Sequence, residues 1–376
     1  MTVALTLTDD QSQLRDSARD FLSEQSPVSA LRQLRDSASA DGFSRPLWAR
    51  FAEMGYTGVL VPEAHGGLGL GHVEAGVVMD QIGHQLCASP LLASAIVATT
   101  ALKLAGSAAQ QAAWLPRLAA AEAIATLAVD EAAKHRPQQL ATSARTEGGA
   151  WLLDGAKSLV LDGHVADVFI VAARVGEAGT GLFLVDAKAT GVVVERTVMV
   201  DAHNAARVQF KAVQLGADAL LGTPETGAAT LAATLDAGRC AAAAELLGLA
   251  DEVFARTLDY IKQRKQFGKL IAEFQGLQHR ASMLYADLEI SRAALIQAQQ
   301  ALDADIHGAG KAVAVAKARA GRTATTAVQE GVQMHGGMGM TDAFEIGFFM
   351  KRARVLQELW GDSNFHSNAF ATHQGY

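Results

Sequence analysis

A cationic and aromatic segment at residues 260–278 holds the first side chains whose types and spacing could do chemistry. It reads YIKQRKQFGKLIAEFQGLQ and places Lys262, Arg264, Lys265 and Lys269 within eight residues of a chain whose net charge is −7. Gly268 gives the backbone freedom to turn there. An Arg side chain binds two phosphate oxygens at once, whereas a Lys offers a single point charge. The segment indicates a site for a phosphate-bearing ligand, and the alternative is a solvated loop between two helices.

A second segment with chemical potential is the glycine-rich run QMHGGMGMT at residues 333–341. Gly336, Gly337 and Gly339 place three glycines in four residues, which lets the backbone approach a ligand and present its amide groups. The alternative is a turn that ends a helix, because glycine is common just past helix C-termini.

Composition narrows the class of protein around these segments. The chain has 376 residues, of which 50% are hydrophobic and 19% charged, a profile typical of a globular protein of two or three domains. No basic tract suggests nucleic acid, and Cys87 and Cys240 are too far apart for a metal site or a disulfide framework. The N-terminal sequence lacks the features of a signal peptide, and no apolar run reaches the roughly 18 residues of a membrane span. We therefore expect a cytoplasmic protein without nucleic-acid, membrane or metal partners.

Hydrophobic periodicity predicts the elements that position the two segments. Helical patterns continue to about residue 123, with Thr8 as an N-cap, and the predicted helices include 47–54, 73–85, 91–104 and 108–121. Short β-branched runs between 124 and 222 indicate a small antiparallel β domain; they are 125–129, 151–154, 158–161, 168–172, 182–185, 192–196 and 207–211. From residue 227 the pattern predicts four helices, at 227–262, 273–303, 308–332 and 344–372, whose spacing suits a four-helix bundle.

Several phrases resemble the acyl-CoA dehydrogenase family of flavoenzymes. They are RKQFG followed by FQGLQ, the run QMHGGMG, and PEAHGGLG, WLPRL and LLDGAKSLVLDGHVADVFIVAAR. The resemblance spans nearly the whole chain and implies a mainly α fold with a central antiparallel β domain. It divides the chain into an N-terminal helical domain at 1–123, the β domain at 124–222 and a C-terminal four-helix bundle at 223–376. It also implies FAD as cofactor, an acyl-CoA substrate, an electron-transfer protein as acceptor, and a homo- or hetero-oligomer in a bacterial cytoplasm.

The resemblance carries flavin contacts onto matching positions. Arg264 would pair with the FAD pyrophosphate of a neighbouring subunit. The other implied contacts from the bundle are Gln266, Phe267, Ile271, Phe274, Gln275, Gln333, Gly336 and Gly337, and those beside the isoalloxazine are Leu127, Val129, Leu159 and Leu161. The chain departs from the family at residues 128–132, AVDEA, where the family often has Met-Thr-Glu-Pro. Asp130 or Leu161 would replace a Thr hydroxyl there, so the β-domain contacts are the less certain part of the comparison.

The family's catalytic carboxylate has no counterpart at its usual positions. Those positions align with Trp360 and Gly238, and a third, often acidic in relatives, aligns with Ala343. One interpretation is another base in this chain, with Glu245 two helical turns past Gly238 as first candidate and Arg239 as electrostatic support. Weaker candidates for that base are Asp362, Glu345 and Asp130.

A second interpretation is that the chain is one subunit of a heteromer whose partner supplies the base. Its phrases are most similar to bacterial heteromeric subunits that act on steroid-like or other bulky acyl-CoA esters. A third is a flavin-binding but catalytically inactive structural subunit, or a flavin oxidase or monooxygenase on the same fold.

Overall fold

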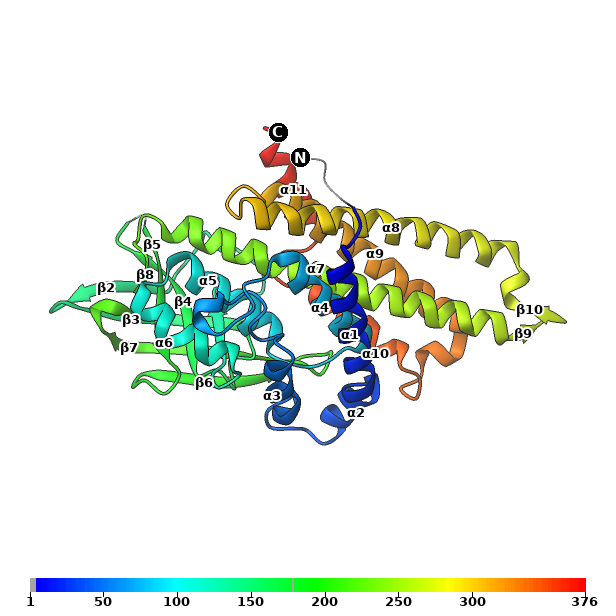
Figure 1. Cartoon of the computed structure of the whole chain (residues 1–376), viewed down its shortest axis with the longest axis horizontal. Helices are drawn as coiled ribbons and strands as arrows, with labels where there is room; N and C mark the ends of the chain where they lie inside the picture. Colours follow the sequence, from blue (N-terminus) through cyan, green and yellow to red (C-terminus); the bar gives the residue numbers. More distant parts are fainter. Residues whose placement is uncertain (1–4, 178) are drawn as a thin grey trace. The chain divides into compact units, whose positions relative to one another are not determined.

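The computed structural model describes residues 5–177 and 179–376, and these form two compact units (Figure 1). One unit comprises Met1–Gln33, Gly76–Cys87 and Arg239–Tyr376, and the other Leu34–Ala75 and Ala88–Gly238. The expectation that the N-terminus is not a signal peptide falls in part on residues 1–4, which lie outside the described ranges. Among the described helices, none is both long and apolar enough to cross a lipid bilayer.

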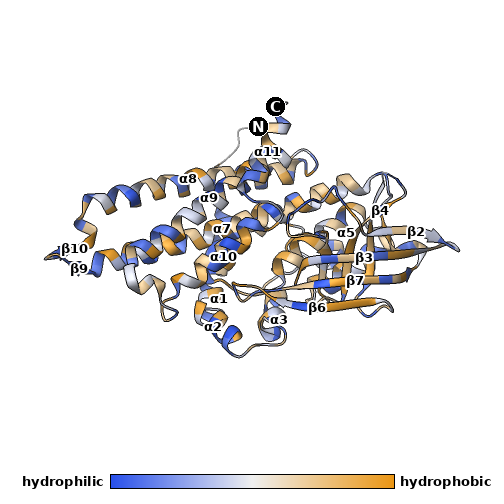
Figure 2. Cartoon of the chain, turned by 180° about the vertical axis from the view of Figure 1, so that it is seen from behind, coloured by the Kyte–Doolittle hydropathy of each residue, from blue (hydrophilic) through white to orange (hydrophobic). Residues whose placement is uncertain are grey.

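The first unit is a helical assembly built around long helices from the C-terminal half of the chain. Its elements are α1 (Asp9–Gln25), the C-terminal parts of α4 (His72–Gln85) and α7 (Gly227–Gln263), α8 (Gln275–Ala304), α9 (Gly310–His335), α10 (Ile346–Glu358) and α11 (Ser363–His373). Helix α2 (Val28–Asp36) spans a boundary between the units. Thr8 caps α1 in a reciprocal pair with Gln11, as predicted. In Figure 2 these helices carry hydrophilic and hydrophobic residues in alternation, as helices with one packed face do.

The single helix predicted at 344–372 is wrong, because the chain breaks between α10 and α11. Trp360 has a φ of 53° and Gly361 a φ of 109°, and neither value fits a right-handed helix. The Asp362 side chain then caps α11 by accepting from the backbone N–H of Phe365. Apolar residues continue at helical spacing on both sides of the break, so the hydrophobic pattern predicted a single helix.

Two glycines let α4 and α7 pack backbone to backbone within the first unit. A methyl group added at Gly83 would come within 2.2 Å of the Glu245 carbonyl oxygen, and one at Gly248 within 1.9 Å of the Asp80 carbonyl oxygen. No side chain larger than a hydrogen fits at such a crossing. The contact fixes α7 where it carries Glu245.

The second unit contains a mixed sheet in the order β6-β7-β3-β2-β4-β5-β8, with β1 paired to β4. Its strands are β1 (Ala125–Ala128), β2 (Ser143–Glu147), β3 (Ala150–Leu161), β4 (Val168–Val175), β5 (Gly179–Asp186), β6 (Val192–Val198), β7 (Asn204–Leu215) and β8 (Leu220–Leu221). Most neighbours are antiparallel, as expected, but β1 and β2 both pair with β4 in parallel. The two runs predicted at 151–154 and 158–161 are one strand, β3, which pairs with β7 through irregular register. Its helical segments are α3 (Arg45–Glu53), η1 (Glu63–His65), η2 (Leu91–Ala98), α5 (Thr99–Ala105), α6 (Ala108–Ala119) and η3 (Ala217–Ala219).

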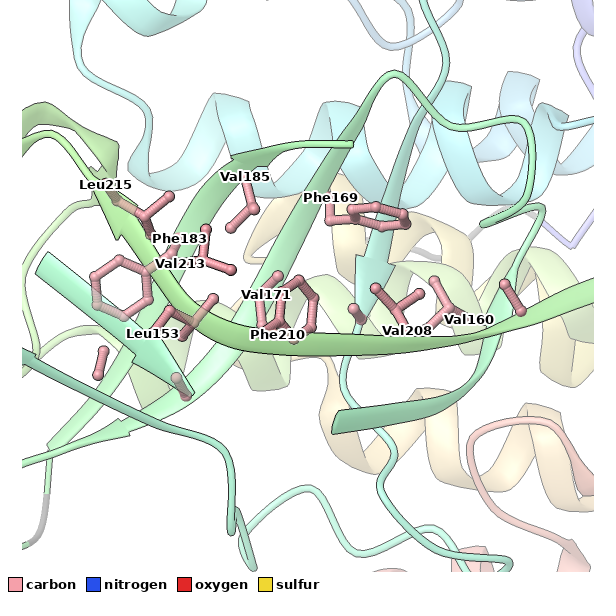
Figure 3. Close-up of a cluster of buried hydrophobic side chains, with 14 residues drawn as sticks. Leu153, Val160, Phe169, Val171, Phe183, Val185, Val208, Phe210, Val213 and Leu215 are labelled. Carbon is pink, nitrogen blue, oxygen red and sulfur yellow. The ribbon is translucent and has the colours of Figure 1, made fainter. Parts of the chain in front are cut away.

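The core of the sheet is a cluster of alternate strand residues (Figure 3). Phe169 on β4 and Phe210 on β7 meet edge to face with ring centroids 6.3 Å apart, and Phe183 on β5 meets Trp151 at 5.1 Å. Edge-to-face packing of this kind adds to the hydrophobic free energy of burial. The sheet is therefore a rigid frame for the strand ends at 127–131 and 157–161.

We predict that Gly248→Ala lowers the free energy of unfolding by roughly 1–3 kcal/mol, because the added methyl must displace the α4 backbone. Gly347→Ala is the matched control, since a methyl there meets no atom within 4 Å. Urea unfolding of both variants measures the difference. Equal midpoints for the two variants would contradict the close crossing.

Candidate functional site

The cationic segment at 264–270 forms a short hairpin at the end of the α7–α8 pair (Figure 1). Strand β9 (Lys265–Gln266) pairs antiparallel with β10 (Lys269–Leu270), which leaves Phe267 and Gly268 as a two-residue turn. Both have positive φ, 52° and 79°, as a type I′ hairpin turn requires. The turn holds Phe267 in an uncommon conformation for a residue with a side chain, and hairpins with such strain often serve a function.

The hairpin presents its side chains to the outside. Phe267 is 91% exposed, and Arg264, Lys265 and Gln266 are exposed as well. Within the described part of the chain, no side-chain hydrogen bond or ion pair of Arg264 is found. In Figure 2 the first strand of the hairpin, β9, is coloured as hydrophilic and lies at the outer end of α8. An exposed arginine beside an exposed phenylalanine is an arrangement suited to binding another molecule.

Aromatic and cationic groups support the base of the hairpin. The Lys269 ammonium lies 4.2 Å from the Phe274 ring centroid, and Phe267 meets Phe274 edge to face at 6.2 Å. Ile271, in the short helix η4 (Ile271–Glu273), donates its backbone N–H to the Arg264 carbonyl at 2.9 Å. Phe274 and Ile271 are half-buried, whereas Gln275 is exposed at the start of α8. The predicted hairpin residues are thus brought together.

The glycine run 336–340 forms one short helical turn, η5, directly after α9. Gly336 has φ 60° and ψ −138°, a conformation that only glycine adopts readily. Gly337 has neither a positive φ nor a neighbour within 4 Å of an added methyl group, so packing inside this chain does not demand a glycine there. Gln333, Gly336 and Gly337 are all exposed. The open space over Gly337 fits a backbone that receives a ligand.

The candidate residues of the β domain lie on β1, directly after it, and in the C-terminal part of β3. Leu127 and Val129 are buried, and Leu161 is half-buried and accepts a hydrogen bond from Thr126 Oγ1 at 2.7 Å through its carbonyl. Leu159 has φ 52°, sits where the β3–β7 register shifts, and is 45% exposed. An exposed apolar side chain held at a bulge is the feature of this sheet that most indicates contact with a ligand.

A buried ion pair anchors the segment next to these residues. The Lys157 ammonium donates to Glu131 Oε1 at 2.7 Å and to the Val129 carbonyl at 3.0 Å, while the Glu131 carboxylate accepts the backbone N–H groups of Ala141 and Thr142. Burial by itself raises the pKa of Glu131, but the hydrogen bond and charge of Lys157, with the bonds from Thr142 and Ala141, together outweigh burial and lower that pKa. Asp130, the suggested stand-in for a Thr hydroxyl, bonds His135 Nδ1 at 2.7 Å. The carboxylates here hold the 131–142 loop closed.

The two positions expected for a catalytic carboxylate hold a glycine in mid-helix and a buried tryptophan. Gly238 lies within α7, and Trp360, which is 5% exposed, forms the break between α10 and α11. Arg239 donates through Nε to the Trp360 carbonyl at 3.0 Å. Lys317 of α9 donates to the carbonyls of Leu356, Gln357 and Gly361 at 2.8, 3.1 and 3.3 Å. Two buried basic side chains therefore hold this turn through its carbonyl groups.

Sequence reasoning did not identify Lys317. Burial, and then the positive charge of Arg239, lower the pKa of Lys317 to about 7. Its three carbonyl acceptors match the three donors of an ammonium group. Only the fold brings a lysine in an Ala-rich helix to the end of α10, and the sequence contains no signal for it.

Glu245, the alternative base, is wholly buried in an ion pair. Its Oε1 accepts from Arg352 Nε at 2.6 Å, and Oε2 has no hydrogen-bond partner among the described residues. The side chains of Glu245 and Arg352 are 1% and 9% exposed. Arg352 gave no signal in the sequence either. The pair favours the interpretation of Glu245 as a structural charge that joins α7 to α10.

Three family models cover almost the whole chain. The N-terminal, middle and C-terminal domain models of acyl-CoA dehydrogenases match residues 8–122, 125–213 and 225–374. The chain belongs to the acyl-CoA dehydrogenase family.

Relatives agree with this assignment. The acyl-CoA dehydrogenase FadE12 of Mycobacterium tuberculosis is 30% identical over 332 residues, which are 86% of each chain. The mitochondrial long-chain specific acyl-CoA dehydrogenase of Sus scrofa is 30% identical over 362 residues, 93% of this chain and 83% of the relative. These matches confirm the family, and with it the predicted oxidoreductase class.

Solved structures with the same fold include two heteromeric complexes. A variant of the Tcur3481–Tcur3483 steroid ACAD superposes with a TM-score of 0.89 at 29% identity, covering 98% of both chains. The ChsE4–ChsE5 complex from Mycobacterium tuberculosis superposes with a TM-score of 0.90 at 25% identity, covering 99% of both chains. The predicted fold class, mainly helical with a central β domain, is confirmed.

This acyl-CoA dehydrogenase family member also contains a charged cluster with metal-ligand residue types. Single ligand atoms of Asp80, His84 and Asp251 lie within 4.8 Å of one another. Burial lowers the pKa of His84, but hydrogen bonds to Asp80 and Glu252 outweigh burial and raise it to about 10. A protonated imidazole has no lone pair for a metal, and Asp251 already pairs with Arg292 at 2.8 Å. The cluster is an ionic network, in which Arg256 also joins Glu252 to Glu345.

A cavity of about 610 Å³ opens beside this network in the first unit. Its charged lining residues, Arg15, Asp80, Glu289 and Arg292, each have an opposite charge nearby. None of the site residues predicted from the sequence lines it. It is therefore separate from the candidate flavin contacts.

We predict that Arg352→Met lowers the free energy of unfolding by roughly 3–5 kcal/mol, because it leaves the Glu245 carboxylate buried without its cation. The double variant Glu245→Leu with Arg352→Met recovers most of that loss, since both charges are then absent. Denaturant unfolding measures both. A double variant as unstable as the single one would show that the pair is not the source of the effect.

We predict that His84 makes stability depend on pH between about 6.5 and 10. Its folded pKa is raised, so its contribution is full below the unfolded pKa of about 6.5 and is lost as pH rises through about 10. The difference in free energy of unfolding between the wild type and His84→Gln should shrink across this range. Because both proteins contain the same other titrating groups, Lys317 among them, the contributions of those groups cancel in this difference. A constant difference would contradict a protonated His84.

Proposed function

We propose that this chain binds FAD and takes part in the α,β-desaturation of an acyl-CoA thioester as one subunit of a hetero-oligomer. The observation that carries the proposal is a contrast between the proposed flavin contacts and the positions of the family's base. The flavin-contact residues Arg264, Gln266, Phe267, Gln333, Gly336 and Gly337 are present and exposed. The positions of the family's base hold Gly238 and Trp360 instead.

The described residues fit the phosphates of FAD. Arg264 has the planar fork that pairs with a pyrophosphate, and Gly336 and Gly337 present backbone close to open space. Gln266, Phe267, Ile271, Phe274, Gln275 and Gln333 complete the proposed nucleotide contacts. Leu127, Val129, Leu159 and Leu161 are the proposed contacts of the β domain. We keep the division at 1–123, 124–222 and 223–376 as the proposed domains.

The reaction needs a base that removes the Cα proton of the thioester. When bound, FAD supplies the acceptor for the hydride that leaves Cβ. A carboxylate suits the base, because burial raises its pKa toward neutrality. In this chain Arg239 and Lys317 hold the turn at residues 359–361 by its carbonyls, so they fix the backbone where the family places that carboxylate.

The origin of the base decides between two mechanisms. Accepting a proton would cost Glu245 its ion pair with Arg352, whose positively charged guanidinium is buried beside it. We therefore favour a base supplied by a second, dehydrogenase-like subunit. Arg239 then acts as support for the turn at Trp360 rather than for a base beside it.

The steroid ACAD and the ChsE4–ChsE5 complex support the heteromer and a bulky acyl group as substrate. The proposed electron acceptor is an electron-transfer protein, and the proposed location is a bacterial cytoplasm. The rival function is a flavin oxidase or monooxygenase on the same fold, or an inactive structural subunit. Oxygen consumption without an added acceptor would favour the oxidase.

We predict that the chain purified alone shows no acyl-CoA dehydrogenase activity, and that co-expression with a dehydrogenase-like subunit from the same genome yields an active, yellow complex. Activity is measured by dye reduction with acyl-CoA esters of increasing bulk. Glu245→Gln in that complex should leave the turnover per flavin unchanged. Full activity of the lone chain, abolished by Glu245→Gln, would overturn the partner-supplied base.

We predict that Arg264→Ala weakens flavin binding roughly 10- to 100-fold, because a charge-assisted contact contributes about 1.5–3 kcal/mol. Arg264→Lys should fall between the wild type and Ala, since it keeps the charge but loses the fork. Arg354→Ala is the matched control, because that exposed arginine pairs with Glu358 on α10. The flavin-to-protein ratio after dialysis measures the effect, and unchanged occupancy in Arg264→Ala would remove the assigned role.

A further inference from the structure

Three aromatic rings form a continuous stack in the first unit. The His335 ring lies with its centroid 4.3 Å from that of Tyr260 and 4.6 Å from that of Phe344, at interplanar angles of 33° and 44°. His335 is 3% exposed, and the two outer rings are half-buried. At these distances both other rings are in contact with the imidazole.

Each member of the stack lies beside a segment proposed to contact the flavin. Tyr260 is one helical turn before the hairpin, and its carbonyl accepts the backbone N–H of Arg264 at 3.0 Å. His335 is the last residue of α9 and directly precedes Gly336. Phe344 follows the glycine run and precedes α10. One stack therefore joins the bases of the hairpin, the glycine run and α10.

Only one of the two ring nitrogens of His335 has a hydrogen-bond partner among the described residues. Its Nδ1 is 2.7 Å from the Gly331 carbonyl, so it is the donor, and Nε2 is buried without a hydrogen-bond partner among the described residues. Burial lowers the pKa of His335, so the ring is neutral near pH 7. A neutral ring loses little by packing between two aromatic faces, whereas a charged one would lack an acceptor for its second N–H.

Hydrogen bonds and an ion pair also restrain the residues that follow Gly337. Within the glycine run, the Thr341 backbone N–H and Oγ1 both donate to the Met338 carbonyl, at 3.1 and 2.8 Å. Arg32 pairs with Asp342 just beyond it, at 3.0 Å. Met338 and Met340 are 50% and 75% exposed. The His335 ring is thus the buried group nearest in sequence to Gly336 and Gly337.

We propose that His335 is a positioning residue that couples the Arg264 hairpin to the glycine run, so that both segments are set to bind the same dinucleotide. The inference rests on the proposed flavin site and adds to it a residue with no contact of its own to the ligand. Removing the ring would leave a cavity between Tyr260 and Phe344, and the two segments would then lose their common support. Such a loss lowers affinity through the cost of ordering the segments on binding.

The test compares His335→Ala with His335→Phe in the assembled protein. His335→Ala should weaken flavin binding about tenfold or more, and His335→Phe should restore most of the affinity, because it keeps a ring in the stack. His366→Ala is the matched control: His366 is also a buried imidazole, packed against Phe365 on α11, which belongs to neither segment. It should lower Tm without changing the flavin dissociation constant.

Hydrogen–deuterium exchange of the flavin-free protein gives a readout that does not depend on bound cofactor. His335→Ala should raise exchange at both 264–270 and 336–341, and His366→Ala at neither. Tyr260→Ala should reproduce the effect, and the Tyr260→Ala, His335→Ala double variant should be no worse than the more severe single one. If His335→Ala itself fails to fold, Tyr260→Ala carries the same test.

The outcomes separate this inference from the flavin site itself. If Arg264→Ala weakens flavin binding but His335→Ala and Tyr260→Ala do not, the coupling is wrong and the site stands. If Arg264→Ala has no effect, the site itself is wrong. Increased exchange in only one of the two segments, or a His335→Phe variant as weak as His335→Ala, would overturn the coupling.

Discussion

The close packing of α4, α7, α8, α9 and α10 is the constraint on which the rest of the first unit depends. Helices α4 and α7 meet through Gly83 and Gly248, where a single added methyl has no room. Buried polar contacts then fix the remaining helices, such as the Ser291–Thr323 hydroxyl pair at 2.8 Å between α8 and α9. Because the helices cannot shift, their ends present the hairpin and the glycine run in a defined arrangement.

Buried charges in this unit serve that packing. Glu245 and Arg352 neutralise each other between α7 and α10, and Lys317 and Arg239 are satisfied by carbonyl groups at the break after α10. A cation bound to the C-terminal carbonyls of a helix is favoured by the helix dipole. The break around Trp360 is consequently held by cations from two helices, although no carboxylate side chain stands at residue 360.

The exposed groups contrast with these paired charges in the interior. Arg264, Phe267 and the amides around Gly337 face outward, whereas the carboxylates that sequence reasoning considered as bases are engaged in structural contacts. Exposed candidate ligand contacts, together with candidate carboxylates that are held in structural contacts, are consistent with the proposed site shared with a second subunit. The aromatic stack of Tyr260, His335 and Phe344 lies beneath both outward-facing segments, and we propose that it couples them.

The sequence by itself determined the family, the mainly helical fold with a β domain, and the identity of the cationic and glycine-rich segments. These features depend on local patterns: helical and strand periodicity, glycine at turns, and residues adjacent in the chain. Tertiary structure alone decided the break at 359–362, the parallel pairing of β1 and β2 with β4, and the partners of Glu245, Lys317 and His335. Arg352 is 107 residues from Glu245, and no local pattern carries information across that separation. A buried carboxylate is a base or a structural charge according to what packs against it, and only the fold settles that.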